Sequence, residues 1–117
     1  MTATFALVEC AADAFRAGHM TLHCIPAPAD SGSPVLAGAR VDFVAKAAYG
    51  KLEPLGFAFI TEVARARLDL ITDDEIRAAG YPNWTLFSAT WTALYGAKGF
   101  SWDVDPDAWM IRFSVTG

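Results

Sequence analysis

Residues 80–96 read GYPNWTLFSATWTALYG, and this stretch decides the fold. Pro82-Asn83-Trp84 is expected to open a helix. Apolar side chains then recur at three- and four-residue steps, which places them on one side of a helix. They are Trp84, Phe87, Trp91, Leu94 and Tyr95. The pattern predicts a helix whose aromatic face is buried against another layer.

The segments on either side of this helix predict another helix and a strand. Thr72-Asp73-Asp74-Glu75 fits a capping box, so a short helix is expected to run to Ala79 and to end at Gly80. On the other side, Gly96 and Gly99 end the aromatic helix and an acidic segment over 103–107 follows. Apolar side chains then alternate as in a final strand, at Trp109, Ile111, Phe113 and Val115.

The first half of the chain is dominated by patterns typical of strands. Strands are expected over 4–8, 20–25, 41–46 and 55–67, with a helix over 11–17 that ends at Gly18 and a loop over 26–38. The segment 55–67 is long enough to bend around a barrel. Residues 1–117 are therefore predicted to form a single α+β domain, with a curved, barrel-like sheet of about five to six strands and two to three short helices.

The composition is typical of a compact domain without a membrane span or a disulfide scaffold. Apolar residues make up 54% of the 117 and charged residues 19%, as in a compact domain. No apolar run approaches the ~20 residues of a membrane span, and no signal peptide is evident, so a cytoplasmic protein is expected. Two cysteines are too few for a disulfide scaffold. A net charge of −4 means that any contact with nucleic acid must be local.

The order of these elements resembles the ASCH family, whose fold is PUA-like. The resemblance spans nearly all of the chain. Its carriers are residues 15–20, 56–63, 70–75 (LITDDE), 80–84 (GYPNW), Trp91, Tyr95-Gly96 and Ile111-Arg112-Phe113. It implies a β-barrel with helices at its rim, and a cleft between barrel and helices where members of the family are thought to bind RNA or nucleotides.

The resemblance does not extend to the residues that imply catalysis. The family signature places a lysine two residues after the glycine, here Met20, and a threonine a few residues later, near His23. A glutamate before the Gly-aromatic step corresponds to Ala79. Amide hydrolysis needs a nucleophile or activated water and a proton shuttle, and neither Met nor Ala supplies them. The substitutions favour a module without catalytic activity.

Candidate ligand-binding residues come from the expected cleft and from turns beside it. They are Met20, His23, Lys46, Tyr49, Arg65, Arg67, Tyr81 and Trp84. Arg65 and Arg67 share a strand face and could contact phosphate together with Lys46. The alternative is a solvated face with salt bridges to Glu62 and Asp69. Tyr81, Trp84 and Trp102 could stack on bases, whereas the spacing of Trp91 and Trp109 favours core packing.

No metal or cofactor is expected. His19 and His23 share a strand face but would lie about 13 Å apart at ~3.3 Å per residue, which is too far for one metal. Asp103, Asp105 and Asp107 imitate the start of a calcium loop without its later Gly and Glu.

Three hypotheses of function remain open. The first is a binding module for RNA or a nucleotide in the cleft. The second is a hydrolase with a rearranged site, a nucleoside deacylase or ribonuclease that uses His23 with Arg65 or Lys46. The third is a protein-interaction factor that binds a partner through the loop 26–36. The abundance of Ala, with Arg preferred over Lys, suggests a GC-rich genome, actinobacterial or of a phage of such a host.

Overall fold

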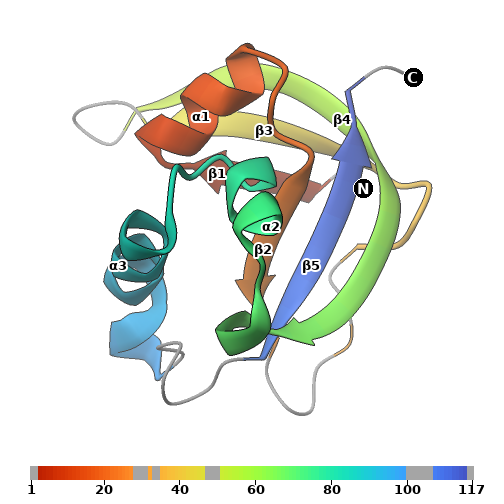
Figure 1. The fold of residues 1–117 in the computed structure, drawn as a ribbon. Helices are drawn as coiled ribbons and strands as arrows, with labels where there is room; N and C mark the ends of the chain where they lie inside the picture. Colours follow the sequence, from red (N-terminus) through yellow and green to blue (C-terminus); the bar gives the residue numbers. More distant parts are fainter. Residues whose placement is uncertain (1–2, 28–31, 33–34, 47–50, 100–106, 116–117) are drawn as a thin grey trace.

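The protein is a five-stranded mixed sheet, curled into a half-barrel, with three α-helices around it (Figure 1). The structure is a computed structural model and describes residues 3–27, 32, 35–46, 51–99 and 107–115. The strands are β1 (Ala3–Leu7), β2 (Leu22–Pro26), β3 (Arg40–Lys46), β4 (Leu52–Arg67) and β5 (Asp107–Ser114). The helices are α1 (Glu9–Arg16), α2 (Asp73–Ala78) and α3 (Trp84–Tyr95), with 3-10 turns η2 (Leu68–Leu70) and η3 (Gly96–Lys98).

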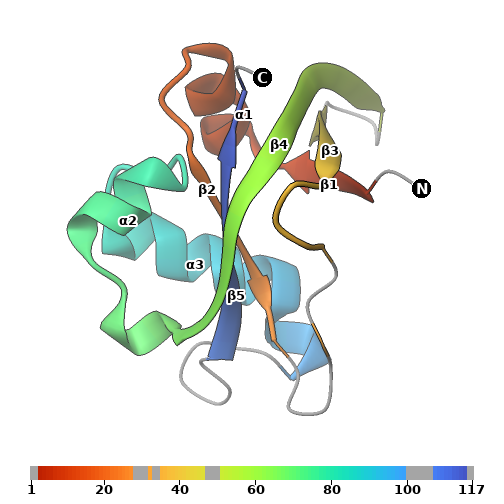
Figure 2. The same cartoon turned by 90° about the vertical axis from the view of Figure 1, so that its right-hand side faces the viewer.

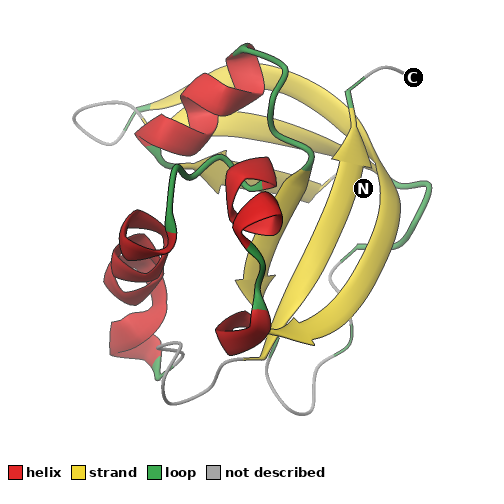
Figure 3. Ribbon diagram, viewed as in Figure 1, coloured by secondary structure: helices red, strands yellow, loops and turns green. Residues whose placement is uncertain are grey.

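The strand order is β1-β3-β4-β5-β2, and β1 with β3 is the parallel pair while the other three pairs are antiparallel. The curl brings the two edge strands, β1 and β2, towards each other (Figure 3). The Phe5 ring of β1 lies 4.6 Å from the His23 ring of β2, measured between ring centroids. The predicted α+β architecture with a curved, barrel-like sheet is confirmed, with five strands and three helices in the described part of the chain.

The long strand β4 produces the curl. Its 16 residues arch across the molecule and pair with β3 at one end and with β5 at the other (Figure 2). The register shifts between Phe43 and Val44 against β3, and between Ile60 and Glu62 against β5. Such irregularities bend a strand and increase its twist. The predicted bending around a barrel is therefore confirmed.

Two hydrophobic cores lie on opposite faces of the sheet. The barrel core fills the inside of the curl beneath α1 and contains Phe15, Phe43 and Ile111 among its buried residues. The helix-side core lies between the sheet and α2 and α3, and includes Leu22 and Phe87. Because β2 and β5 separate the two cores, both of their faces carry apolar side chains.

The helices begin and end largely as the sequence predicts. Thr72 caps α2 through a complete capping box with Glu75, and Asn83 caps α3 by accepting a hydrogen bond from the Leu86 amide at 2.9 Å. Gly80 has a φ of +95°, and a Cβ there would lie 2.7 Å from the Cα of Ala11. Only glycine allows α1 and this turn to approach so closely.

Some boundaries differ from the prediction. The strand expected over 20–25 begins at Leu22, and Met20 instead enters the barrel core. Pro26 forms the last position of β2, which is tolerated because β2 is an edge strand. Val115 was expected in the final strand but lies beyond it and is exposed. Tyr49, Trp102, the acidic residues 103–106 and most of the loop 26–38 lie outside the described residues.

No helix in the described part of the chain is both long enough and apolar enough to cross a membrane.

Candidate functional site

A pocket lies beside α3, between that helix, α1 and the two edge strands of the sheet. We call it the α3 pocket. Its enclosed part has a volume of about 30 Å³, and the whole hollow, counted with the space open to solvent at its mouth, is about 440 Å³. It therefore combines a small closed interior with a wider mouth.

The walls of the α3 pocket are apolar and aromatic, with a few polar groups. The apolar residues are Ala6, Leu7, Val8, Ala11, Ala79, Phe87, Trp91 and Leu94. The polar ones are His23, Cys24, Tyr81 and Tyr95. Ligand sites typically have this character, with apolar walls and a small number of groups that can form hydrogen bonds.

His23 is the most distinctive polar group of the pocket. Its imidazole stacks at a tilt against Phe5 and meets Phe43 edge-on at 6.0 Å between ring centroids. Burial lowers the pKa of His23 to about 4, so the ring is neutral at physiological pH. Within the described part of the chain, no side chain or backbone group forms a hydrogen bond with this imidazole. A neutral imidazole carries one donor and one acceptor, and neither has a partner among the described groups.

The two tyrosines of the pocket are also neutral. Tyr81 meets Phe87 edge-on at 5.2 Å, and Tyr95 meets Trp91 at 4.7 Å, between ring centroids. Burial raises the pKa of both phenols, so they stay protonated and can donate hydrogen bonds.

Cys24 contributes no reactive thiolate. Its Sγ donates a hydrogen bond to the Met110 sulfur at 3.5 Å, and burial, with a smaller effect from Glu75, raises the pKa of the thiol to about 12. The thiolate is the nucleophilic form, so this thiol is inert at neutral pH. Cys10 and Cys24 are both free thiols.

The positions that correspond to the family's catalytic set are partly brought together. His23 and Ala79 both line the α3 pocket, whereas Met20 is 2% exposed in the barrel core. None of the described residues that line the pocket is a carboxylate, a lysine or an arginine. The pocket therefore offers hydrogen bonds and aromatic surface, and its described lining holds no charged partner that could orient or charge His23.

Lys46 lies apart from His23. It sits at the end of β3 beside a shallow hollow that it shares with Arg16, Asp13 and Glu53. Tyr49 lies outside the described residues. The sequence predicted one cleft lined by five residues: Met20, His23, Lys46, Tyr49 and Arg65. The four of these that the structure describes do not lie together, so they do not form that cleft.

Arg65 and Arg67 are both held by acidic partners. The Arg65 Nη2 donates to the Ala27 carbonyl oxygen at 2.8 Å and to Asp107 at 3.0 Å, and its guanidinium lies 5.6 Å from the Trp109 ring centroid. Arg67 forms a bidentate contact with the Asp69 carboxylate, to which its Nε and Nη2 donate hydrogen bonds at 2.9 and 2.8 Å. The alternative prediction, a solvated strand face with salt bridges, is confirmed for Asp69, which pairs with Arg67. It is wrong for Glu62, which pairs with Arg112 rather than with Arg65.

All six arginines of the chain lie within 4.0 Å of a carboxylate. They are Arg16, Arg40, Arg65, Arg67, Arg77 and Arg112. A phosphate backbone would have to compete with these carboxylates for every arginine. The expected basic lining is thus largely neutralised within the chain itself.

The expected division between aromatic residues that pack in the core and those that could stack on a base is confirmed in part. Trp91 is buried and forms a wall of the α3 pocket, and Trp109 packs at the edge of the barrel core. Trp84 is half-buried and packs against Phe87 in the helix-side core, and it does not line the pocket. Tyr81 is the residue of the suspected stacking set that reaches the pocket.

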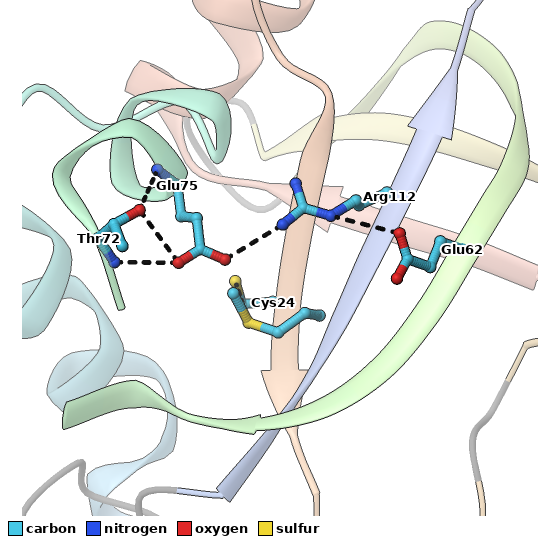
Figure 4. Close-up of polar contacts among 6 residues, drawn as sticks. Cys24, Glu62, Thr72, Glu75 and Arg112 are labelled. Carbon is cyan, nitrogen blue, oxygen red and sulfur yellow. Dashed lines mark hydrogen bonds and ion pairs between the residues drawn. The ribbon is translucent and has the colours of Figure 1, made fainter. Parts of the chain in front are cut away.

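Two features were not predicted from the sequence. One is the place of Tyr95 in the lining of the pocket, and the other is a chain of polar contacts that links α2 to β5 and β4. In that chain the Arg112 Nη2 donates to Glu75 at 3.2 Å and its Nε lies 3.8 Å from Glu62 (Figure 4). Glu75 also accepts a hydrogen bond from the Thr72 amide at 3.0 Å. Helical spacing assigned Tyr95 to the buried face, but spacing alone could not reveal that its ring borders a pocket.

The histidines considered for metal binding, His19 and His23, line different hollows. His19 is exposed in a separate hollow with Arg77 and Pro82. Within the described ranges, no three His, Cys, Asp or Glu side chains lie where they could hold one ion.

Comparison with known proteins shows similarity in structure rather than in sequence. No family model and no curated protein matches the chain. The crystal structure of an ASCH domain from Lactobacillus crispatus superposes with a TM-score of 0.67 at 12% identity, over 97% of this chain and 79% of that one. A protein from Enterococcus faecalis V583 described under the family name DUF984 superposes with a TM-score of 0.71 at 13% identity, over 99% and 80%. An ASCH protein from Zymomonas mobilis superposes with a TM-score of 0.62 at 11% identity, over 95% and 65%.

These similarities agree with the strand order, the curled sheet and the placement of the helices described above. At such low identity these similarities show the fold alone, and the activity has to be argued from the site itself. The chain has the fold of the ASCH domains.

Proposed function

We propose that the chain is a non-catalytic binding module that holds an uncharged planar group in the α3 pocket. The ligand is a nucleobase, presented by a nucleoside, a nucleotide or a single strand of RNA. Aromatic walls from Phe87 and Trp91 offer surface for a flat ring, and base–aromatic contacts of this kind tolerate any base.

His23 carries the proposal. The residue lines the pocket, its imidazole packs on Phe5 and Phe43 where the two edge strands approach each other, and this neutral ring has no hydrogen-bond partner among the described groups. The edge of a nucleobase carries complementary donors and acceptors, so His23 would orient the base while the tyrosine hydroxyls add further contacts.

The charge distribution supports binding of a base over binding of a phosphate backbone. The described lining of the pocket is neutral, and the six arginines are occupied by carboxylates. Affinity would therefore depend only weakly on salt, because few counterions are released when a neutral group binds.

The same features disfavour the hydrolase alternative. A general base works best with a pKa near the operating pH, whereas the pKa of His23 is about 4. The described lining also provides no carboxylate to orient the imidazole and no cation to stabilise an oxyanion.

The test is a titration of the four common nucleosides and of a short single-stranded RNA, followed by chemical shifts of the pocket amides. His23→Gln should weaken binding about tenfold, since a hydrogen bond to the ligand is lost. His19→Gln is the matched control, because it alters an exposed imidazole outside the pocket, and it should leave affinity unchanged.

Raising salt from 50 to 200 mM should change the affinity by less than about tenfold, against about 10³ or more for a ligand gripped by six or more phosphates. A steep salt dependence that His23→Gln leaves untouched would contradict the proposal. Turnover of acylated nucleosides or of RNA that disappears in His23→Gln would establish the hydrolase instead.

A further inference from the structure

α2 and α3 cover only part of the outer side of the sheet, the side opposite the barrel core. They pack over β2, β5 and the end of β4. Figure 2 shows both helices on the left, and β1, β3 and the first half of β4 on the right, away from them. We call the outer side of these three strand segments the open face. Its most exposed ring is Phe57, which is 42% exposed and meets the half-buried Phe59 edge-on at 5.8 Å between ring centroids.

The strand register shows that these two rings share one surface with residues of β1 and β3. Phe57 is paired with Asp42 of β3, and Asp42 is paired with Thr4 of β1. Phe59 is paired with Arg40. Directly paired residues of neighbouring strands point to the same side of a sheet, so the open face is continuous across the three strands.

Arg40 and Phe57 together form a surface for a flat ring. The guanidinium carbon of Arg40 lies 4.2 Å from the Phe57 ring centroid, and its Nη2 lies 3.5 Å from the Asp42 carboxylate. These two contacts hold the planar guanidinium over the ring, while the arginine side chain stays about half exposed. Bases of single-stranded RNA stack on arginine planes as well as on aromatic rings. The open face therefore offers stacking positions at Arg40 and at the neighbouring phenylalanines.

The charge of the open face differs in sign from that of the whole chain. The outer row of β3 contains two cations, Arg40 and Lys46, and one anion, Asp42. No described carboxylate lies within ion-pair distance of the Lys46 ammonium. The residues of β4 paired with this row are the apolar Phe59, Phe57, Pro54 and Leu52. A weakly positive surface with exposed rings, on a chain of net charge −4, favours a ligand that combines aromatic groups with negative charge.

The open face leads into the α3 pocket. Ala6 of β1 is paired with Val44 on this face and also lines the pocket. Strands lie about 4.8 Å apart and rise about 3.3 Å per residue, so Phe57 is about 12 Å from Ala6 along the sheet. At about 3.4 Å per stacked nucleotide, this span corresponds to three to four nucleotides. Thr4 and Ala6, which lie between the pocket and Phe57, are small and exposed.

We propose that the open face is the second part of an RNA-binding site. One base of a single strand occupies the α3 pocket, and the bases beside it stack on Arg40, Phe57 and Phe59. The choice of RNA as the occupant rests on the proposed function. The preferred ligand is then a strand of about four nucleotides rather than a free nucleoside, because stacking on the open face adds affinity that a nucleoside cannot use.

The test compares a ligand that reaches only the pocket with ligands that reach both parts. Affinity is measured for a nucleoside and for oligoribonucleotides of two, four and six nucleotides, and it should rise up to about four. Phe57→Ala should weaken binding of the longest RNA about fivefold or more and leave binding of the nucleoside unchanged. Leu70→Ala is the matched control, since it removes an exposed apolar side chain from η2, beyond the other end of β4, and it should change neither affinity.

Two further variants separate stacking from simple apolar contact. Phe57→Tyr keeps the aromatic ring and should keep the affinity for RNA, whereas Phe57→Leu keeps an apolar side chain and should lose affinity as Phe57→Ala does. Circular dichroism checks that each variant is folded. Loss of RNA affinity in Phe57→Tyr as large as in Phe57→Leu would contradict the stacking role.

The outcomes distinguish this site from the proposed function. If nucleosides bind through His23 but Phe57→Ala leaves RNA affinity unchanged, the open face is not part of the site, and the pocket stands. If RNA binding depends on Phe57 while no nucleoside binds, the open face stands and the pocket proposal fails. Sedimentation of the chain without RNA tests the rival occupant. A dimer that Phe57→Ala converts to a monomer, with RNA affinity unchanged, would assign the face to a second copy and overturn the inference.

Discussion

α2 and α3 cover the same side of the sheet but are held by different contacts. α2 carries Glu75, which pairs with Arg112 of β5 (Figure 4). The carbonyl oxygen of Ala78, the last residue of α2, accepts a hydrogen bond from the Thr21 amide. α3 instead places the rings of Phe87 and Trp91 into the helix-side core.

The difference teaches that two helices on one side of a small sheet can be held by different kinds of contact. Polar contacts of defined geometry hold α2 in a single position, because each bond is lost by a small displacement. Apolar contact is not directional, so the hold of the Phe87 and Trp91 rings on the sheet depends on the area they bury and on how well they pack. The α3 pocket lies at the boundary between these two kinds of attachment.

The largest expected effect comes from deleting the main anchor of α3. Trp91 is 4% exposed, and Trp91→Ala should destabilise its surroundings by about 3–5 kcal/mol, as large core truncations do. If α3 is a separable unit, this loss falls mainly on residues 84–95, whose amides become fast to exchange. Urea unfolding by circular dichroism, combined with amide exchange, measures both the size and the distribution of the loss.

Phe43→Ala is the matched control, since Phe43 is 1% exposed in the barrel core and a similar loss is expected there. It should lower the protection of all strands together, because the barrel core holds the whole sheet. A Trp91→Ala variant whose sheet loses as much protection as that of Phe43→Ala would show that the two helices are equally fixed.

The second prediction concerns pH and His23 in the α3 pocket. Burial lowers the pKa of His23 from 6.5 to about 4, so the unfolded chain binds a proton more readily than the folded one. The stability from the neutral imidazole is therefore complete above pH 6.5 and is lost as the pH falls towards 4. The shift corresponds to on the order of 3 kcal/mol. Urea unfolding between pH 4 and 7 measures it.

His23→Gln should remove this part of the pH dependence. Other groups also contribute in acid, since the Arg67 guanidinium holds the pKa of Asp69 below its ordinary value. The difference between wild type and His23→Gln isolates the histidine, because both proteins keep Asp69. Parallel stability curves for the two proteins would mean that His23 is solvated in the folded state.

The elements of the fold could be predicted because their signals are local. The capping box at Thr72, the aromatic spacing of α3 and the alternation of β5 each depend on neighbours a few residues away. The exact ends of strands were harder, as Met20 shows: its burial depends on how α1 and β2 meet, which no local pattern encodes.

The site was harder to predict because it depends on residues far apart in the chain. His23 and Tyr81 were singled out from the sequence and do lie in one pocket, but Lys46 and Arg65 sit elsewhere. The ion pair of Arg65 with Asp107 joins residues 42 positions apart and follows from strand register, whereas Arg67 pairs with Asp69 only two residues away. A charge count could limit phosphate binding, but only the register shows that Asp107 lies against Arg65.

The smallest effect is expected from loosening α2. In Glu75→Gln the side-chain oxygen can still accept from the Thr72 amide, so the helix cap is kept while the charge that faces Arg112 is lost. The pair is partly exposed, so the cost should be about 1 kcal/mol or less. Glu62→Gln is the control, because Glu62 faces the same guanidinium from 3.8 Å and is more exposed than Glu75, and it should have a smaller effect. Amide exchange should then rise in residues 73–78 and stay unchanged in α3. If α3 loosens equally, the two helices behave as one unit and the ion pair of α2 stabilises both.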